Sequence, residues 1–212
     1  MAYVIINPNS TAAMTDGMLE VARAAVPGVT IEGWTNAGGP PAIQGHEDGL
    51  KAAPSLLELI DKANAQGVDG IIVGCFDDTA LAQAQARSGV PVIGIGQAAY
   101  HAAALRGWSF SVVTTLAVSV PILEENIIGY GFEHLLGKVR ASDVPVLALE
   151  EDPETATEAV AAETARAMAG DGVDCVILGC AGMAKLTAHL RDRFDKPVID
   201  GVESAARLIS VL

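Results

Sequence analysis

The sequence predicts an α/β fold of two pseudo-symmetric Rossmann-like lobes, each a four-stranded parallel sheet flanked by helices, with the active site in the cleft between them. Three observations predict it. Short β-rich runs alternate with longer helical runs along the whole chain. The stretch "GVDGIIVGCFDD" at 67–78 returns as "GVDCVILGCAGM" at 172–183. The other elements of the second half follow those of the first at a nearly constant offset.

The first half contains four successive strand-helix units. The β-rich runs predict strands at 3–7, 29–34, 69–75 and 90–95. Helical spacing predicts helices over 10–26, 46–67 and 77–88, and a fourth that begins near Gln97. Ser10 is expected to cap the first helix, and Gly67 and Gly89 lie near helix ends. Connections of this βαβ type imply a parallel sheet that is covered on both faces.

The second half repeats this series. Strands are predicted at 110–115, 144–150, 174–180 and 196–200, and helices from Ala117, Pro153, Ala181 and Gly201. The offset is 107 residues between the first strands (3 and 110) and 105 between the cysteines (75 and 180). We therefore expect a first lobe over 1–96, completed by the C-terminal helix 201–212, and a second lobe over 97–200.

Composition and charge exclude several classes of function. Half of the 212 residues are hydrophobic and 18% are charged, which is typical of a globular chain. The formal net charge of −13 would repel nucleic acid and anionic membranes, so neither is an expected partner. No basic segment with an apolar core opens the sequence, and no apolar run reaches the roughly 18 residues of a membrane span. We expect a cytoplasmic protein.

Two of the three cysteines occupy equivalent positions in the repeat. Cys75 and Cys180 each end the third strand of a lobe, where ligands of open parallel sheets bind. An approximate two-fold axis would bring them to opposite sides of one pocket. Cys175 lies inside a strand and is expected to pack in the core. Buried cysteines are common, so a purely structural role is the competing interpretation for all three.

Two facing thiols are suited to the inversion of a carbon stereocentre, because one can remove a proton while the other delivers one. A thiol has an unperturbed pKa of about 8.5, and a helix N-terminus can lower it. Backbone N–H groups after each cysteine, at 76–78 and 181–183, would stabilise the carbanion. This chemistry needs no metal and no cofactor, and neither is expected; the four histidines lack metal-ligand spacing.

The chain resembles the hydantoin and allantoin racemase branch of the aspartate/glutamate racemase superfamily. The residues that carry the resemblance are "INPNST" at 6–11, "GCFDD" at 74–78, "VPVIGI" at 90–95, "FSVVTT" at 110–115 and "LGCAGM" at 178–183. The resemblance implies a cofactor-independent two-base racemase with Cys75 and Cys180 as the acid/base pair. It also implies a homo-oligomer, and substrate contacts from Asn9, Ser10, Thr114 and Thr115.

Amino-acid racemases of this superfamily have Asn-Thr after the first cysteine and Thr-His after the second. Here the corresponding substrate-binding positions are Phe76-Asp77 and Ala181-Gly182. Acidic residues also outnumber cations in the loops at the strand ends, which disfavours a dicarboxylate. A neutral ring, either a 5-monosubstituted hydantoin or allantoin inverted at C5, is therefore the predicted substrate.

Other interpretations remain open at this point. An amino-acid racemase or another isomerase of the superfamily would share the thiols, and a non-catalytic small-molecule binding protein would use the cysteines only structurally. The stretch "GIGQAA" at 94–99 resembles a dinucleotide-binding pattern but is expected to form a tight strand-to-helix turn. The Gly/Pro-rich segment 35–45 is either a lid over the pocket or a plain connecting loop.

Overall fold

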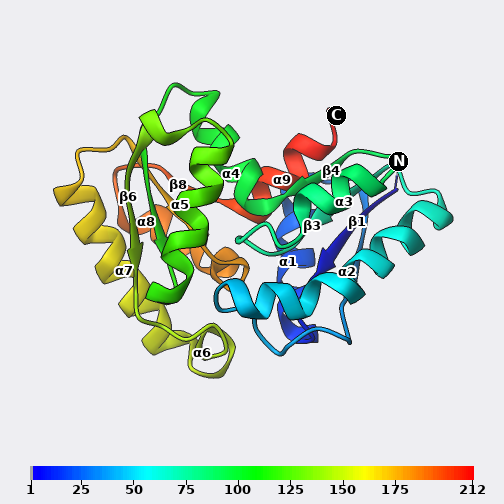
Figure 1. Cartoon of the computed structure of the whole chain (residues 1–212). Helices are drawn as coiled ribbons and strands as arrows, with labels where there is room; N and C mark the ends of the chain where they lie inside the picture. Colours follow the sequence, from blue (N-terminus) through cyan, green and yellow to red (C-terminus); the bar gives the residue numbers. More distant parts are fainter. Residues whose placement is uncertain (1) are drawn as a thin grey trace.

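A computed structural model describes residues 2–212 and contains two four-stranded parallel sheets that lie side by side (Figure 1). Their strand orders are β2-β1-β3-β4 and β6-β5-β7-β8, so the second sheet repeats the order of the first. This is the α/β fold that the repeat predicts. Among residues 2–212, no helix is both long and apolar enough to cross a membrane.

The first sheet consists of β1 (Ala2–Asn7), β2 (Thr30–Thr35), β3 (Gly70–Val73) and β4 (Val92–Gly94). Its helices are α1 (Ala12–Ala25), α2 (His46–Gln66), α3 (Leu81–Arg87) and α4 (Ile95–Ala104). The second sheet consists of β5 (Phe110–Thr114), β6 (Leu136–Ala141), β7 (Cys175–Leu178) and β8 (Val198–Asp200). The helices of the second half of the chain are α5 (Val120–Gly129), α6 (Ala148–Glu151), α7 (Pro153–Gly170), α8 (Thr187–Arg193) and α9 (Gly201–Ile209). Short 3-10 helices cover Ala117–Ser119, Glu133–Leu135 and Ala181–Leu186.

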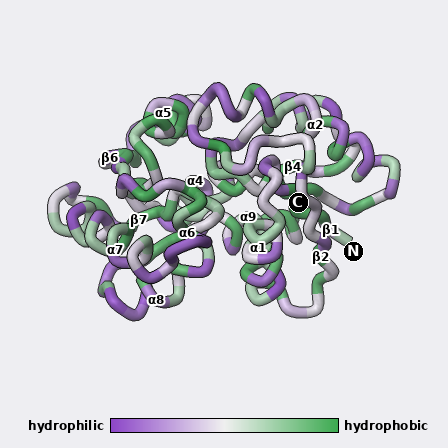
Figure 2. The backbone as a smooth tube through the Cα atoms, turned by 90° about the horizontal axis from the view of Figure 1, so that it is seen from below, coloured by the Kyte–Doolittle hydropathy of each residue, from purple (hydrophilic) through white to green (hydrophobic). Residues whose placement is uncertain are grey.

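The central strands are apolar on both faces because helices cover both faces. In β1, Val4 and Ile6 belong to one hydrophobic cluster with α2, whereas Tyr3 and Ile5 belong to another with α1 and α4. This alternation follows from the two-residue repeat of a strand. Hydrophobic residues gather in the interior, and hydrophilic residues recur along the peripheral helices (Figure 2). One cluster also includes Phe110 of β5, so the two lobes share a continuous core.

The second strand of the second lobe lies in a different segment from the one that the sequence predicts. A strand is predicted over residues 144–150, but 144–147 are irregular and α6 begins at Ala148. The strand is β6 at Leu136–Ala141, which pairs with β5 at the edge of the sheet. Only Val139 of its six residues is buried, so this strand lacks the apolar run of a central strand. The repeat offset itself points to β6, because β2 and β6 begin 106 residues apart (30 and 136).

The C-terminal helix α9 returns to the first half of the chain. It contacts α1 and α4 as well as the strands β3 and β4, and the two chain ends lie on the same side of the molecule (Figure 1). Helix α4 in turn contacts β7, β8 and α5. These two helices therefore connect the lobes, and the exact domain boundary near residue 96 stays a prediction.

Candidate functional site

Cys75 and Cys180 occupy equivalent positions at the carboxyl ends of the two sheets. Each lies two residues beyond its strand, since β3 ends at Val73 and β7 ends at Leu178. The preceding glycines are held by equivalent hydrogen bonds: the N–H of Gly74 donates to Ile6 and that of Gly179 donates to Val113, both over 2.8 Å. A Cβ on Gly74 would come within 2.8 Å of Met18 Sδ, and one on Gly179 within 2.7 Å of Val112. Close approach explains why glycine precedes each cysteine.

The two cysteines line one pocket between the lobes. The pocket is lined by Asn9, Met14, Ile43, Gly74, Cys75, Phe76, Asp77, Thr114, Thr115, Ser119, Val146, Gly179, Cys180, Ala181 and Gly182. Both cysteines are free, and each residue as a whole is half-buried. The third cysteine, Cys175, is fully buried inside β7, with its Sγ 3.6 Å from the Ser109 carbonyl oxygen. The separation of Cys175 from the other two agrees with the sequence prediction.

Among the sequence-predicted contact residues, Ser10 is the one that does not line this pocket. Its N–H donates to the Pro40 carbonyl over 2.9 Å, and its role in substrate binding stays a prediction. Ser10 is not a helix cap either, because α1 begins after Thr11, which makes no side-chain capping bond. Asn9 lines the pocket and also orders the turn, where its Oδ1 accepts the Thr11 N–H over 2.9 Å.

The turn after Cys75 has an unusual backbone. Asp78 and Ala80 both have positive φ angles, of 50° and 53°, a conformation that residues other than glycine rarely adopt. The carboxylate of Asp78 holds this turn against the start of α4, where it accepts the N–H groups of Gly96 over 3.1 Å and Gln97 over 2.7 Å. It also accepts the Tyr130 hydroxyl over 2.9 Å, which links the turn to the second lobe. Such strained residues persist where surrounding contacts fix them, often at functional sites.

Burial favours the protonated form of both thiols. It raises the pKa of Cys180 to about 12 and raises the pKa of Cys75 as well, and the charge of Asp77 acts in the same direction on both. Backbone N–H groups act in the opposite direction. That of Asp77 lowers the pKa of Cys75, and those of Gly182 and Met183 lower the pKa of Cys180. The expectation that a helix N-terminus lowers the thiol pKa is wrong for Cys75, because α3 begins only at Leu81.

Asp77 is the acidic side chain that lines the pocket. Burial raises the pKa of its carboxyl to about 7, while a hydrogen bond from the backbone of Gly45 lowers it. Only 7% of the residue is exposed, and its Oδ2 has no hydrogen-bond partner. The Asp77 carbonyl oxygen accepts the Asn126 side chain over 2.9 Å. The residue is therefore fixed by its backbone while one carboxyl oxygen remains unsatisfied.

Sequence reasoning missed four side chains of the pocket. Met14 and Ser119 come from α1 and from the 3-10 helix at Ala117–Ser119, and nothing in their neighbourhood singles them out. Ile43 is the one large apolar residue of the segment 35–45. Val146 belongs to the apolar run 144–150, for which the sequence predicts a strand. An isolated apolar residue in a Gly/Pro-rich loop is a signal that could have found Ile43.

The pocket is closed over by segments from both lobes. Gln44 Oε1 accepts the Val146 N–H over 3.1 Å, which joins the segment 35–45 to the loop before α6. The volume of this cavity is about 30 Å³. Small-molecule sites usually measure about 300–1,000 Å³. The mobility of the segment 35–45 as a lid stays a prediction.

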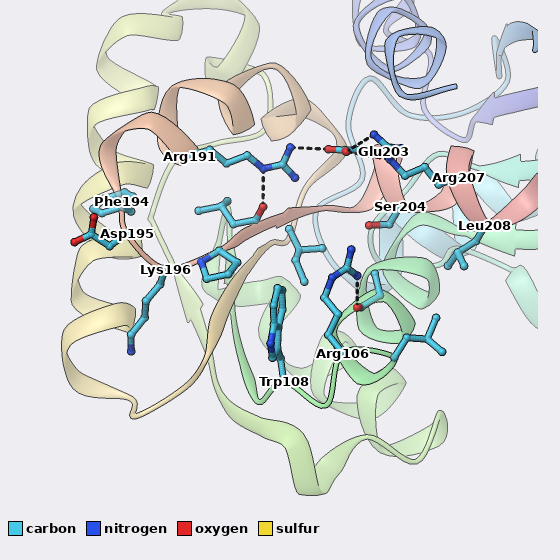
Figure 3. A pocket seen from close by; sticks show the side chains of 15 residues that line it. Arg106, Trp108, Arg191, Phe194, Asp195, Lys196, Glu203, Ser204, Arg207 and Leu208 are labelled. Atoms are coloured by element: carbon cyan, nitrogen blue, oxygen red, sulfur yellow. Dashed lines mark hydrogen bonds and ion pairs between the residues drawn. The ribbon is translucent and has the colours of Figure 1, made fainter. Parts of the chain in front are cut away.

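A larger pocket of about 510 Å³ lies away from the cysteines, beside β8 and α9 (Figure 3). Its cations already have partners: Arg191 and Arg207 both bind Glu203, and Arg106 donates to the Ala102 carbonyl oxygen. Lys196 donates to the carbonyl oxygens of Met168 and Val173. Each of the four cations that line this pocket therefore has a partner within the described part of the chain. The part of the chain that the structure describes also contains no cluster of side chains that could hold a metal ion.

Comparisons with known proteins agree with this fold. The family model described as Asp/Glu/Hydantoin racemase matches residues 4–209. A hydantoin racemase of Rhizobium meliloti is 44% identical over 98% of this chain and 87% of its own length. One of Pseudomonas sp. (strain NS671) is 33% identical over 100% of this chain and 86% of its own. An allantoin racemase from Klebsiella pneumoniae has a TM-score of 0.96 and 39% identity, over 100% of this chain and 87% of that one.

More distant solved structures share the fold alone. A glutamate racemase from Francisella tularensis has a TM-score of 0.72 and 14% identity, covering 99% of this chain and 79% of its own. A structure of arylmalonate decarboxylase has a TM-score of 0.68 at 15% identity, covering 100% of this chain and 92% of its own. Proteins with this fold thus carry out more than one chemistry.

Proposed function

Since the chain belongs to the Asp/Glu/hydantoin racemase family and is an isomerase of the racemase type, we propose that it inverts C5 of a 5-monosubstituted hydantoin or of allantoin through Cys75 and Cys180. The observation that carries the proposal is the equivalent placement of the two thiols. Each lies two residues beyond the third strand of its lobe, and both line one pocket.

In the proposed mechanism, one cysteine acts as a thiolate and removes the C5 proton while the other, as a thiol, protonates the opposite face. The roles are exchanged for the other enantiomer, and no net redox change occurs. The thiolate is the form that removes the proton, so the raised thiol pKa values require that substrate binding or opening of the pocket favour it. The Gly182 and Met183 N–H groups, which stabilise the Cys180 thiolate, support that step.

The relatives favour a cyclic ureide as the substrate. The hydantoin and allantoin racemases named above match nearly the whole chain, whereas the glutamate racemase shares the fold alone. The lining residues agree, because none of them is basic and one, Asp77, is acidic. An amino-acid carboxylate would meet an anion there instead of a cation. Self-association and a cytoplasmic location stay predictions.

A racemisation assay on a substrate panel tests the proposed function. We expect the optical rotation of single enantiomers of 5-benzylhydantoin or of allantoin to decay well above the buffer rate, with at least a tenfold preference over L-glutamate and L-aspartate. Ligand-induced stabilisation by these compounds without any decay of rotation would instead identify a binding protein. Equal or faster turnover of the amino acids would contradict the cyclic ureide as the substrate class.

A further inference from the structure

Among residues 2–212, a buried carboxylate oxygen without a hydrogen-bond partner belongs to Asp77, a residue that lines the pocket together with the two cysteines. Asp77 is more than nine-tenths buried, yet its Oδ2 has no hydrogen-bond partner in the described part of the chain. Nearly all buried polar groups in folded proteins have a partner, because an unpaired one costs the desolvation free energy of the group. Cys75, Asp77 and Cys180 line the same pocket, so the carboxyl belongs to the site where C5 would react.

We propose that Asp77 Oδ2 accepts a ring N–H of the substrate and thereby selects neutral cyclic ureides over molecules that carry a carboxylate. This inference rests on the proposed function and names the residue that determines its specificity. It also gives a reason for keeping a costly, unpaired acidic group in the pocket: the partner of that group is the substrate.

Two other polar side chains of the pocket, those of Asn9 and Thr114, already make hydrogen bonds within the protein. Asn9 Oδ1 already accepts from the Asn7 side chain over 2.9 Å and from the Thr11 N–H over 2.9 Å. The Thr114 hydroxyl donates to the Gly179 carbonyl oxygen over 2.9 Å. A hydantoin ring brings two N–H donors, which need acceptors once water is excluded. Above its pKa of about 7, Asp77 supplies one that is charged and unoccupied.

Binding of three small ligands tests this contact without relying on turnover. The probes are hydantoin, 1-methylhydantoin and 3-methylhydantoin, which differ only in the N–H that is blocked. Calorimetry at pH 8.5 with the unaltered protein should show that one methyl isomer binds at least tenfold more weakly than hydantoin. In Asp77→Ala, hydantoin itself should bind at least tenfold more weakly, and the difference between the two methyl isomers should fall below about threefold.

The outcomes separate the two proposals. Equal binding of all three ligands, unchanged hydantoin affinity in Asp77→Ala, or no hydantoin binding at all would overturn the role of Asp77. The affinity difference between the two methyl isomers could depend on Asp77 while no 5-substituted hydantoin and no allantoin is racemised. That result would overturn the proposed function but would support the contact between Asp77 and the ring.

Asp77→Asn provides a second, independent test. Removing a buried, unpaired charge should raise the Tm of the ligand-free protein at pH 8.5 by about 5 °C, whereas loss of a structural contact would lower it. The variant should also gain at least tenfold affinity for hydantoic acid, the ring-opened anion, because the repelling charge is gone. A lower Tm together with unchanged affinity for hydantoic acid would show that Asp77 serves the fold and not the selection of ligands.

Discussion

Replacing either pocket cysteine should nearly abolish racemisation. We expect Cys75→Ala and Cys180→Ala each to lower kcat/KM by at least about 10³-fold, since each removes one of two proton-transfer groups and such a group contributes roughly 10²–10⁴-fold. Serine at either position should restore little, because an alcohol is a much weaker acid than a thiol. The measurement is the initial rate of optical rotation decay, starting from each enantiomer separately.

The third cysteine is a matched control for these variants. Cys175 is fully buried inside β7 and does not line the pocket. We expect Cys175→Ala to keep kcat/KM within about threefold and to lose about 1 kcal/mol of stability, since it removes only part of a buried side chain. A loss of activity in Cys175→Ala as large as in the other two, with the protein still folded, would argue against a special role for the pocket thiols.

A methyl group added at Gly96 should disturb the turn that follows Cys75. This glycine lies in the first turn of α4, and a Cβ there would overlap the Phe76 carbonyl oxygen and approach Asp78 Oδ2 to 2.9 Å. The clash falls on the turn that carries Cys75. We expect Gly96→Ala to lower the free energy of unfolding by about 1–3 kcal/mol and to lower kcat, because the turn must shift. Urea unfolding and the racemisation assay measure the two effects.

Gly89 offers the control for that substitution. No atom lies within 4 Å of a Cβ built on it, and its φ is not in the left-handed region. Gly89→Ala should change the free energy of unfolding by less than about 0.5 kcal/mol and leave kcat unaltered. If both alanine variants behaved alike, the close approach of α4 to the Cys75 turn would not matter for the site.

The repeat in the sequence predicted most of the architecture. The two Gly-Cys pairs lie at equivalent strand ends and line one pocket, as their offset of 105 residues (75 to 180) indicates. "GIGQAA" forms the tight strand-to-helix turn expected of it, between β4 and α4. The prediction failed where local composition competed with the repeat. The apolar residues of 144–150 predicted a strand that does not form there. The edge strand β6 was missed because it is largely polar or exposed, as at Gly137 and Lys138.

Other features depend on three-dimensional contacts that no local pattern encodes. The hydrogen bond between Gln44 and Val146 joins two segments that are 102 residues apart in the chain. The unsatisfied oxygen of Asp77 is a property of its surroundings, as are the raised pKa values of Cys75 and Cys180. Sequence alone identifies these residue types at the strand ends, but desolvation depends on everything packed around them.

Isotope incorporation in D2O tests the two-thiol mechanism most directly. One enantiomer of 5-benzylhydantoin is incubated with the protein, and the C5 hydrogen of substrate and product is followed separately by NMR and chiral chromatography during the first few per cent of turnover. Because the second thiol delivers a solvent-derived deuteron, the product should be fully deuterated while the remaining substrate keeps its hydrogen, after subtraction of the buffer exchange. Product that retains the original hydrogen would show that a single group removes and returns the proton, and would contradict the assignment of Cys75 and Cys180 as an acid/base pair.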